Sequence, residues 1–365
     1  MAVGSNVDMV LQLIESRPLL GGRFSDIRRM GPTSDPGAFS LMFTAHDATT
    51  GRRAALKFFN PLLVTGGRNG YRWDCFEREA RLLTRLSALP SVIRCLAPLE
   101  RFAEPLGTSI GIWNLDFAYY AMELAAHSLA DRLARDPGTP EERLTLFHAM
   151  CKAVQALHGE RVAHRDLKPG NCLIMPDGTI RLADLGTARW LADPAGALRP
   201  DYDISPGDVT YTAPELFALL HDADPAIALR ADMFSLGAIL FELLAGQSLG
   251  ATLYTPHFGG VLLHQARALT PERRLALFDS TIRALAAANP LPSVAHRNFP
   301  VPPIILDRVD MLYQSLAALD HRRRERAFQG VFRQIALCLR LLRRGAGRPA
   351  PPRAPVGGGR IGGNR

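Results

Sequence analysis

The order of apolar and polar residues in the first third of the chain is typical of β-strands. Short apolar runs broken by single polar residues occupy residues 38–44 and 53–59. Residues 49–51 (Thr-Thr-Gly) lie between these runs and predict a hairpin turn. Two further strands are expected around residues 96–102 and 110–122. The first third of the chain therefore predicts a sheet.

Helical spacing of apolar residues dominates the remainder. Short amphipathic helices are expected at residues 7–14 and 74–86. Thr139, followed by proline and two glutamates, predicts a capped helix start. Residues 230–245 are apolar on nearly every face, which predicts a buried central helix. Helices are expected again over residues 306–342.

These elements predict an α+β fold of two lobes, a β-rich N-lobe and an α-helical C-lobe, with a ligand cleft between them. The chain has 365 residues and is 47% hydrophobic, so it can bury a large core. Residues 246–300 show a less regular pattern. The Gly-, Pro- and Arg-rich residues 345–365 cannot form a packed core and are expected to be disordered.

The expected location is the cytoplasm. No apolar run reaches the roughly 18 residues that a membrane-spanning helix needs, and the first residues show no secretory signal. The five cysteines are scattered and include no C-x-x-C pair. This pattern favours a reducing compartment and no structural zinc.

The net charge of +8 is concentrated at one end of the chain. From Asp320 onward there are 12 arginines against two acidic residues, so the rest of the chain carries a net charge of −2. Such a basic end could bind an acidic partner, nucleic acid or anionic lipid. A solvated helix face followed by a disordered end is the alternative interpretation.

The strongest chemical signal is the segment 164–171, His-Arg-Asp-Leu-Lys-Pro-Gly-Asn. It places a carboxylate, an ammonium and a carboxamide on one short loop, the groups that phosphoryl transfer from a metal-bound nucleotide requires. Only three of the 43 basic residues are lysines: Lys57, Lys152 and Lys168. In so arginine-rich a chain, a lysine suggests a site that needs a compact point charge.

Four more segments accompany this loop: 54–57 (Ala-Ala-Leu-Lys), 76–80 (Phe-Glu-Arg-Glu-Ala), 184–186 (Asp-Leu-Gly) and 211–215 (Tyr-Thr-Ala-Pro-Glu). In this order, they resemble the signature motifs of the eukaryotic-type (Hanks-type) protein kinase family. The resemblance covers about residues 25–343. Any one of these four segments alone would be an ordinary turn, strand end or surface charge, whereas the loop has no obvious packing purpose and the full set at compatible spacings is specific.

The resemblance implies a serine/threonine protein kinase that uses ATP and Mg²⁺ to phosphorylate protein hydroxyls, its own included. Lys57 would hold the α- and β-phosphates and pair with Glu79. Asp166 would accept or orient the proton of the attacking hydroxyl, while Lys168 would offset charge on the transferred group. The implied metal ligands are Asn171 and Asp184.

The same resemblance implies a nucleotide site and domain boundaries. The residues expected to bind nucleotide are Gly37, Met42, Ala55, Lys57, Met122, Glu123, Ala125 and Leu173. Of these, Met122 would be the gatekeeper, and the hinge backbone would face adenine; ordinary apolar core is the alternative interpretation. The implied divisions are an N-terminal extension (1–24), an N-lobe (about 25–122), a hinge (123–127), a C-lobe (128–343) and a basic disordered tail (344–365).

Supporting contacts are also implied. Asp232 would brace the catalytic loop from the buried helix, and Arg324 would pair with Glu215. Arg165 suggests an activation segment that an anion orders. That anion could be phosphorylated Ser205 or an aspartate already present, Asp201 or Asp203.

The sequence departs from the family pattern at two places. The glycine-rich phosphate loop should fall on residues 35–40, where only Gly37 remains and Asp35 and Ser40 replace the outer glycines. Asp208 stands where the family usually has threonine; it could raise the pKa of a carboxyl group at the site or pair with Lys168. These departures favour a pseudokinase as the alternative function. A small-molecule kinase is a weaker alternative, because the loop lacks that group's His-Gly-Asp pattern.

Overall fold

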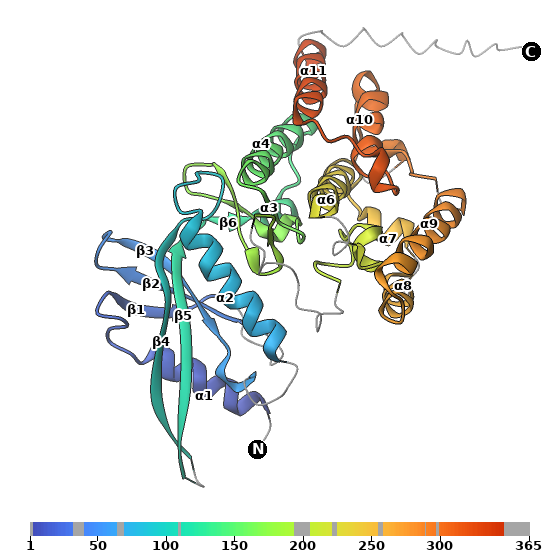
Figure 1. The fold of residues 1–365 in the computed structure, drawn as a ribbon. Helices are drawn as coiled ribbons and strands as arrows, with labels where there is room; N and C mark the ends of the chain where they lie inside the picture. The colour runs from blue at the N-terminus through green and yellow to red at the C-terminus, as the bar shows by residue number, and fades with distance from the viewer. Residues whose placement is uncertain are drawn as a thin grey trace, which may run out of the picture.

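The computed structural model has two lobes, one built on a sheet and one built of helices (Figure 1). The predicted α+β fold, with a β-rich N-lobe and an α-helical C-lobe, is confirmed. The structure describes residues 3–31, 40–63, 69–108, 111–192, 205–220, 225–254, 258–288, 290–296 and 299–346. Gly37, Asp201 and Asp203, which carried predictions, lie outside these ranges.

The N-lobe is a five-stranded antiparallel sheet with strand order β1-β2-β3-β5-β4. The strands are β1 (Phe24–Arg29), β2 (Ser40–Asp47), β3 (Arg52–Phe59), β4 (Cys95–Thr108) and β5 (Gly111–Glu123). The predicted turn at residues 49–51 joins β2 and β3, which pair Ala45 with Ala54. The fourth strand is longer than the predicted residues 96–102, because it pairs with β5 along its whole length.

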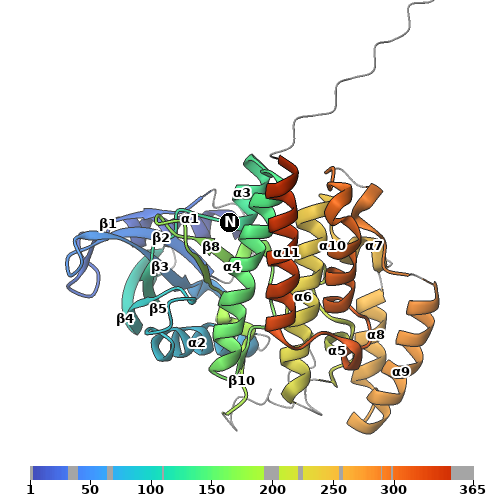
Figure 2. The ribbon, with the colours of Figure 1, turned by 90° about the horizontal axis from the view of Figure 1, so that it is seen from above.

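The two faces of this sheet are covered by different helices, α1 (Val3–Glu15) and α2 (Asn69–Arg85) (Figure 2). Tyr119 and Tyr120 are neighbours on β5, so their side chains point to opposite faces. Tyr119 joins the apolar cluster that contains Val10 of α1, whereas Tyr120 joins the one that contains Phe76 of α2. Part of the predicted N-terminal extension is thus built into the N-lobe core.

The C-lobe packs around α6 (Pro225–Ala245), in which almost every residue from 231 to 245 is buried. The other helices are α3 (Leu129–Arg135), α4 (Pro140–Gly159), α5 (Pro214–Phe217), α7 (Leu249–Leu253), α8 (Phe258–Arg267), α9 (Pro271–Ala288), α10 (Pro303–Leu316) and α11 (Phe328–Ala346). The less regular pattern expected over residues 246–300 is wrong in part, since α7, α8 and α9 lie there. Pro271 begins α9 rather than preventing it.

Short elements carry the loops of the site. The strands are β6 (His127–Ser128), β7 (Val162–Ala163), β8 (Cys172–Ile174), β9 (Ile180–Leu182) and β10 (Arg189–Trp190). The 3₁₀ turns are η1 (Pro61–Leu63), η2 (Pro169–Asn171), η3 (Leu185–Thr187), η6 (Val294–His296) and η7 (His321–Arg323). The helix start predicted at Thr139 is confirmed: its hydroxyl accepts from Glu142 N, and the Glu142 carboxylate accepts from Thr139 N.

Two absences can be stated for the described part of the chain. None of its helices is both long and apolar enough to cross a bilayer. Its five cysteines are all free thiols, and all but Cys95 are buried.

Replacing Asp47 with asparagine is expected to lower the free energy of unfolding by about 2–3 kcal/mol at neutral pH. The Asp47 side chain is fully buried and accepts hydrogen bonds from Arg23 Nε at 2.6 Å and from Arg23 Nη2 at 2.8 Å. The bonds from Arg23, with others from Thr49 and Thr50, hold the pKa of Asp47 well below its usual value, although burial opposes them. Because the folded-state pKa is depressed, this stabilisation is present above about pH 4 and is lost as the pH falls.

Urea unfolding of wild type and Asp47→Asn at pH 7 and pH 3 measures this effect. The gap between the two proteins should narrow at pH 3. Asp26→Asn is the matched control, because Asp26 makes two arginine ion pairs but is exposed. An Asp47→Asn curve that coincides with wild type at pH 7 would refute the prediction.

Candidate active site

The loop 164–171 is suspended from the central helix. Asp232 of α6, which is fully buried, accepts hydrogen bonds from the backbone N–H of His164 and of Arg165, each at 2.8 Å. Nε2 of His158 lies 2.8 Å from the same carboxylate. The bracing role expected for Asp232 is therefore observed. Sequence reasoning missed His158, because nothing in the local pattern of α4 distinguishes this partly buried histidine.

The Asp166 carboxylate is held by groups from the loop itself and from residue 208. Nδ2 of Asn171 donates to the backbone oxygen of Asp166 at 2.8 Å and to its Oδ2 at 3.0 Å. The backbone N–H of Asp208 donates to Oδ1 at 2.8 Å, and Lys168 Nζ lies 3.2 Å from Oδ2. Both carboxylate oxygens are thus oriented before any substrate binds.

Lys57 connects three elements. Its Nζ lies 2.6 Å from Oε2 of Glu79 on α2 and 3.3 Å from Oδ1 of Asp184, just before η3. Lys57 and Glu79 are both buried. The ion pair implied by the sequence is present, and it places α2 close enough to assemble the site.

The electrostatic surroundings shift the pKa values of Asp166 and Asp184 in opposite directions. Burial raises the pKa of Asp166, although the charges of Lys168 and His164 oppose this. The charge of Lys57 lowers the pKa of Asp184 despite burial. Burial opposes the charged form of Lys57, but the carboxylates of Glu79 and Asp184 outweigh it and raise the pKa of Lys57. Carboxyl groups whose pKa values are shifted in opposite directions are suited to different roles.

The backbone at residues 184–186 is specialised. Asp184 has φ 61° and ψ 62°, a left-handed conformation that aspartate tolerates better than most residues. A Cβ atom on Gly186 would lie 3.3 Å from the backbone oxygen of Cys75 on α2, so glycine allows close approach of the helix. Nη1 of Arg78 donates to the Gly186 oxygen at 2.6 Å, a contact that the sequence alone did not suggest.

The apolar residues expected around adenine all belong to, or pack against, one apolar cluster. Ala55 and Met122 are buried in the large apolar cluster, and Met42, Ala125 and Leu173 pack against it. The contacts of Glu123 were not foreseen. Its backbone N–H donates to the oxygen of Arg94 at 3.0 Å. Its carboxylate binds Arg94 and Arg181.

Two roles were predicted for Asp208, raising the pKa of a carboxyl group or pairing with Lys168, and its contacts favour the second. Its carboxylate lies 3.8 Å from Lys168 Nζ, and its Oδ1 accepts from the backbone N–H of Thr210 at 2.9 Å. The side chain is more than one-third exposed, so its ion pair is weak. Asp208 therefore pairs with Lys168, while burial is the main cause of the raised pKa of Asp166.

A cavity of about 510 Å³ opens on the charged groups of the site, between α2 and residues 205–208. Its lining includes Lys57, Glu79, Asp166, Lys168, Asp184 and Asp208. An adjoining cavity of about 440 Å³ shares Lys168 and Asp208 and continues along α3 and α6. The site therefore joins a pocket with charged groups at its base to a groove that could hold an extended chain.

Buried contacts occur near both ends of residues 184–215, which the family resemblance identifies as the activation segment. Arg324 and Glu215 form a fully buried ion pair, with Arg324 Nη2 at 2.8 Å from Glu215 Oε2, as the sequence implied. Arg165 is also buried, with φ 64°, and donates from Nε to the Thr187 oxygen at 2.6 Å. Among the described residues, neither its Nη1 nor Ser205 Oγ has a hydrogen-bond partner.

These two lobes, with a paired lysine and glutamate above a braced aspartate loop, define the class of two-lobed phosphotransferases. Comparison with known families matches residues 30–258, more than half of the chain, to the protein kinase domain. The chain belongs to the Hanks-type serine/threonine protein kinase family.

Several curated proteins resemble the chain. A protein of Corynebacterium efficiens named "probable serine/threonine-protein kinase" is 29% identical over 61% of this chain and 31% of its own length. A serine/threonine-protein kinase of Saccharomyces cerevisiae is 26% identical over 60% of this chain and 19% of its own. Human 3-phosphoinositide-dependent protein kinase 1 is 25% identical over 60% and 35%. The chain thus matches only about a fifth to a third of these relatives' lengths.

Proposed function

We propose that this protein is a serine/threonine kinase that transfers the γ-phosphate of ATP to protein hydroxyls, including its own. The arrangement of Lys57 between Glu79 and Asp184, opposite an oriented Asp166, carries the proposal. Lys168 followed by a proline, as well as the names of the relatives, favours serine and threonine acceptors.

In this proposal each charged group has a separate task. Asp166 accepts the proton of the attacking hydroxyl, and the bonds from Asn171 and Asp208 aim its carboxylate. Lys57 holds the α- and β-phosphates, and Glu79 fixes its ammonium. Lys168, already 3.2 Å from Asp166, offsets charge that develops on the transferred group.

The residues present also fit a magnesium ion bound with the nucleotide, which would neutralise phosphate charge. No group of three or more His, Cys, Asp or Glu side chains suited to a metal occurs among the described residues. A nucleotide-bound Mg²⁺ needs only one or two protein carboxylates, because phosphate and water oxygens complete its shell. Asp184 supplies an ionised carboxylate, and Asn171 commits its amide nitrogen to Asp166, which leaves its oxygen as a ligand.

Substrate recognition and location belong to the same proposal. The groove along α3 and α6 would hold the protein substrate. The Arg-rich C-terminal end would bind an acidic partner, nucleic acid or anionic lipid. The free thiols fit the cytoplasm.

A pseudokinase that only binds nucleotide, or only acts as a scaffold, is the alternative, and Asp208 is the observation that favours it. A thermal-shift assay with and without Mg-ATP, combined with an autophosphorylation assay, separates the possibilities. The kinase proposal requires both a stabilising shift and phosphate incorporation. A shift without incorporation identifies a nucleotide-binding pseudokinase, and the absence of both identifies a scaffold.

Ser205→Ala is expected to lower kinase activity about tenfold or more, because we infer that phosphorylated Ser205 docks on Arg165. Burial and the charges of Arg78 and Arg189 lower the pKa of Arg165 to about 10, so an anion would be strongly favoured there. Initial rates of the purified variant measure the effect, and Ser205→Asp should restore part of the activity. Full activity of Ser205→Ala would instead assign the charge to Asp201 or Asp203.

A further inference from the structure

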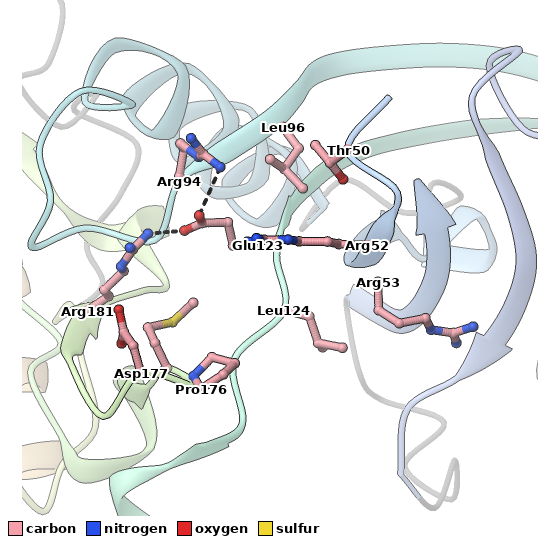
Figure 3. A pocket seen from close by; sticks show the side chains of 11 residues that line it. Thr50, Arg52, Arg53, Arg94, Leu96, Glu123, Leu124, Pro176, Asp177 and Arg181 are labelled. Atoms are coloured by element: carbon pink, nitrogen blue, oxygen red, sulfur yellow. Dashed lines mark hydrogen bonds and ion pairs between the residues drawn. The ribbon is translucent and has the colours of Figure 1, made fainter. Parts of the chain in front are cut away.

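A second cavity, of about 560 Å³, lies behind the hinge and shares no lining residue with the active-site cavity (Figure 3). Four parts of the chain form its wall: the turn before β3 with the start of that strand, the start of β4, the hinge, and the β8–β9 turn with β9. The kinase chemistry proposed above uses only the backbone of the hinge. The cavity therefore needs a separate explanation.

Positive charge dominates this wall, since four arginines and two carboxylates line it. Figure 3 shows Arg94 and Arg181 converging on Glu123. Nη2 of Arg94 lies 3.1 Å from Oε1 of Glu123, and Arg181 binds Oε2 of the same carboxylate. One carboxylate thus serves two guanidinium groups. Arg53 turns away and pairs with Asp26.

Hydrogen-bond donors remain in excess. Each guanidinium group has five N–H donors, and one shared carboxylate accepts only a few of them. Nε of Arg181 is buried and has no partner among the described residues. The Arg52 residue is exposed, and its guanidinium group makes no hydrogen bond or ion pair within the described part of the chain. Outside the basic C-terminal end the chain carries a net charge of −2, so this is a local concentration of positive charge.

The rest of the wall is apolar and includes Leu96, Leu124, Met175 and Pro176. A ligand that satisfies both parts needs carboxylates for the arginines and an apolar side chain for this surface. A phosphate-bearing small molecule would leave the apolar wall unused. Single-stranded nucleic acid favours aromatic surfaces on which bases stack, and no aromatic residue lines the cavity.

We propose that this cavity is a docking site for a short acidic segment, with an apolar side chain, of a partner or substrate protein. The carboxylates would bind Arg52 and the unused donors of Arg94 and Arg181. The segment would contact the hinge from behind without entering the nucleotide cleft. Binding here does not depend on catalysis, so Asp166→Ala should bind the same segment equally well.

A fluorescein-labelled peptide of alternating Glu and Leu residues tests the proposal by fluorescence anisotropy with the full chain. Arg52→Glu should weaken its binding by about tenfold or more. Arg273→Glu is the matched control, because Arg273 is exposed on α9 at the far end of the C-lobe (Figure 2) and the charge change is the same. This control should bind as wild type does, and added salt should weaken binding. Both variants should keep the thermal shift produced by Mg-ATP, which shows that they are folded.

Two results would overturn the proposal. The first is that the arginines do not select the ligand. This would be shown by equal binding of a matched peptide of alternating Gln and Leu, or by equal effects of Arg52→Glu and Arg273→Glu on binding of the Glu-Leu peptide. The second is displacement of the Glu-Leu peptide by inorganic pyrophosphate or an oligonucleotide at matched ionic strength, with that competitor's affinity lost in Arg52→Glu. This second result would assign the cavity to a phosphate-bearing ligand.

Discussion

Asp166→Ala is expected to lose phosphate incorporation from radiolabelled Mg-ATP by about 10²–10⁴-fold. Without the carboxylate, no other described group at the site is positioned to accept the hydroxyl proton, because Asp184 lies against Lys57 and the Asp208 side chain pairs with Lys168. Nucleotide binding should persist, since Lys57 and Glu79 are untouched. A lost rate with a retained Mg-ATP thermal shift would identify Asp166 as the residue of the chemical step.

The matched control for this experiment is Asp116→Ala, which removes an exposed carboxylate from β5. Wild type, Asp116→Ala and Asp166→Ala are compared at equal protein concentration, with the labelled protein counted after separation. Equal labelling of all three proteins would show that the assignment of Asp166 as the base is wrong.

Arg324→Ala is expected to destabilise the C-lobe by about 3–5 kcal/mol. Both side chains of the Arg324–Glu215 pair are fully buried, so the variant leaves a carboxylate without its counter-charge in the core. Arg324 also donates to the backbone oxygens of Ala318, at 2.7 Å, and Arg230, at 3.0 Å. The pair therefore ties the end of the activation segment to the start of α6 and to the loop before α11.

Denaturant unfolding of both single alanine variants and of the double variant with Glu215→Ala measures this coupling. The free energy of unfolding should fall less in the double variant than the sum of the losses in the two single variants, because the double variant leaves no unpaired charge. Arg323→Ala, at an exposed neighbour, is the control and should change stability by less than about 0.5 kcal/mol. Additive losses in the double variant would show that the two side chains do not act as a pair.

The elements that sequence reasoning predicted well are those decided by contiguous residues. The N-cap at Thr139, the turn at residues 49–51 and the buried helix around residues 230–245 all depend on local propensity and periodicity. The helices within residues 246–300 were not predicted because the apolar spacing is less regular there, although Pro271 begins α9.

The contacts of the candidate site also fall into those that the sequence predicted and those that it could not predict. The order of the motifs was sufficient to expect Lys57 beside Glu79, and Arg324 beside Glu215, because the family pattern carries that information. It could not show that the N–H of Glu123 is taken by Arg94, or that Asp208 orients Asp166 through its backbone. These contacts depend on side-chain and backbone placement after packing.

By itself, the sequence determined the two-lobed plan, the order of the elements and the residue types available for phosphoryl transfer. Only the tertiary structure decided which of those groups meet and which donors, such as Arg165 Nη1 and Arg181 Nε, have no partner among the residues that the structure describes. The physical reason is that helix and strand signals lie within neighbouring residues, whereas hydrogen bonds and ion pairs between distant segments exist only once the chain is packed.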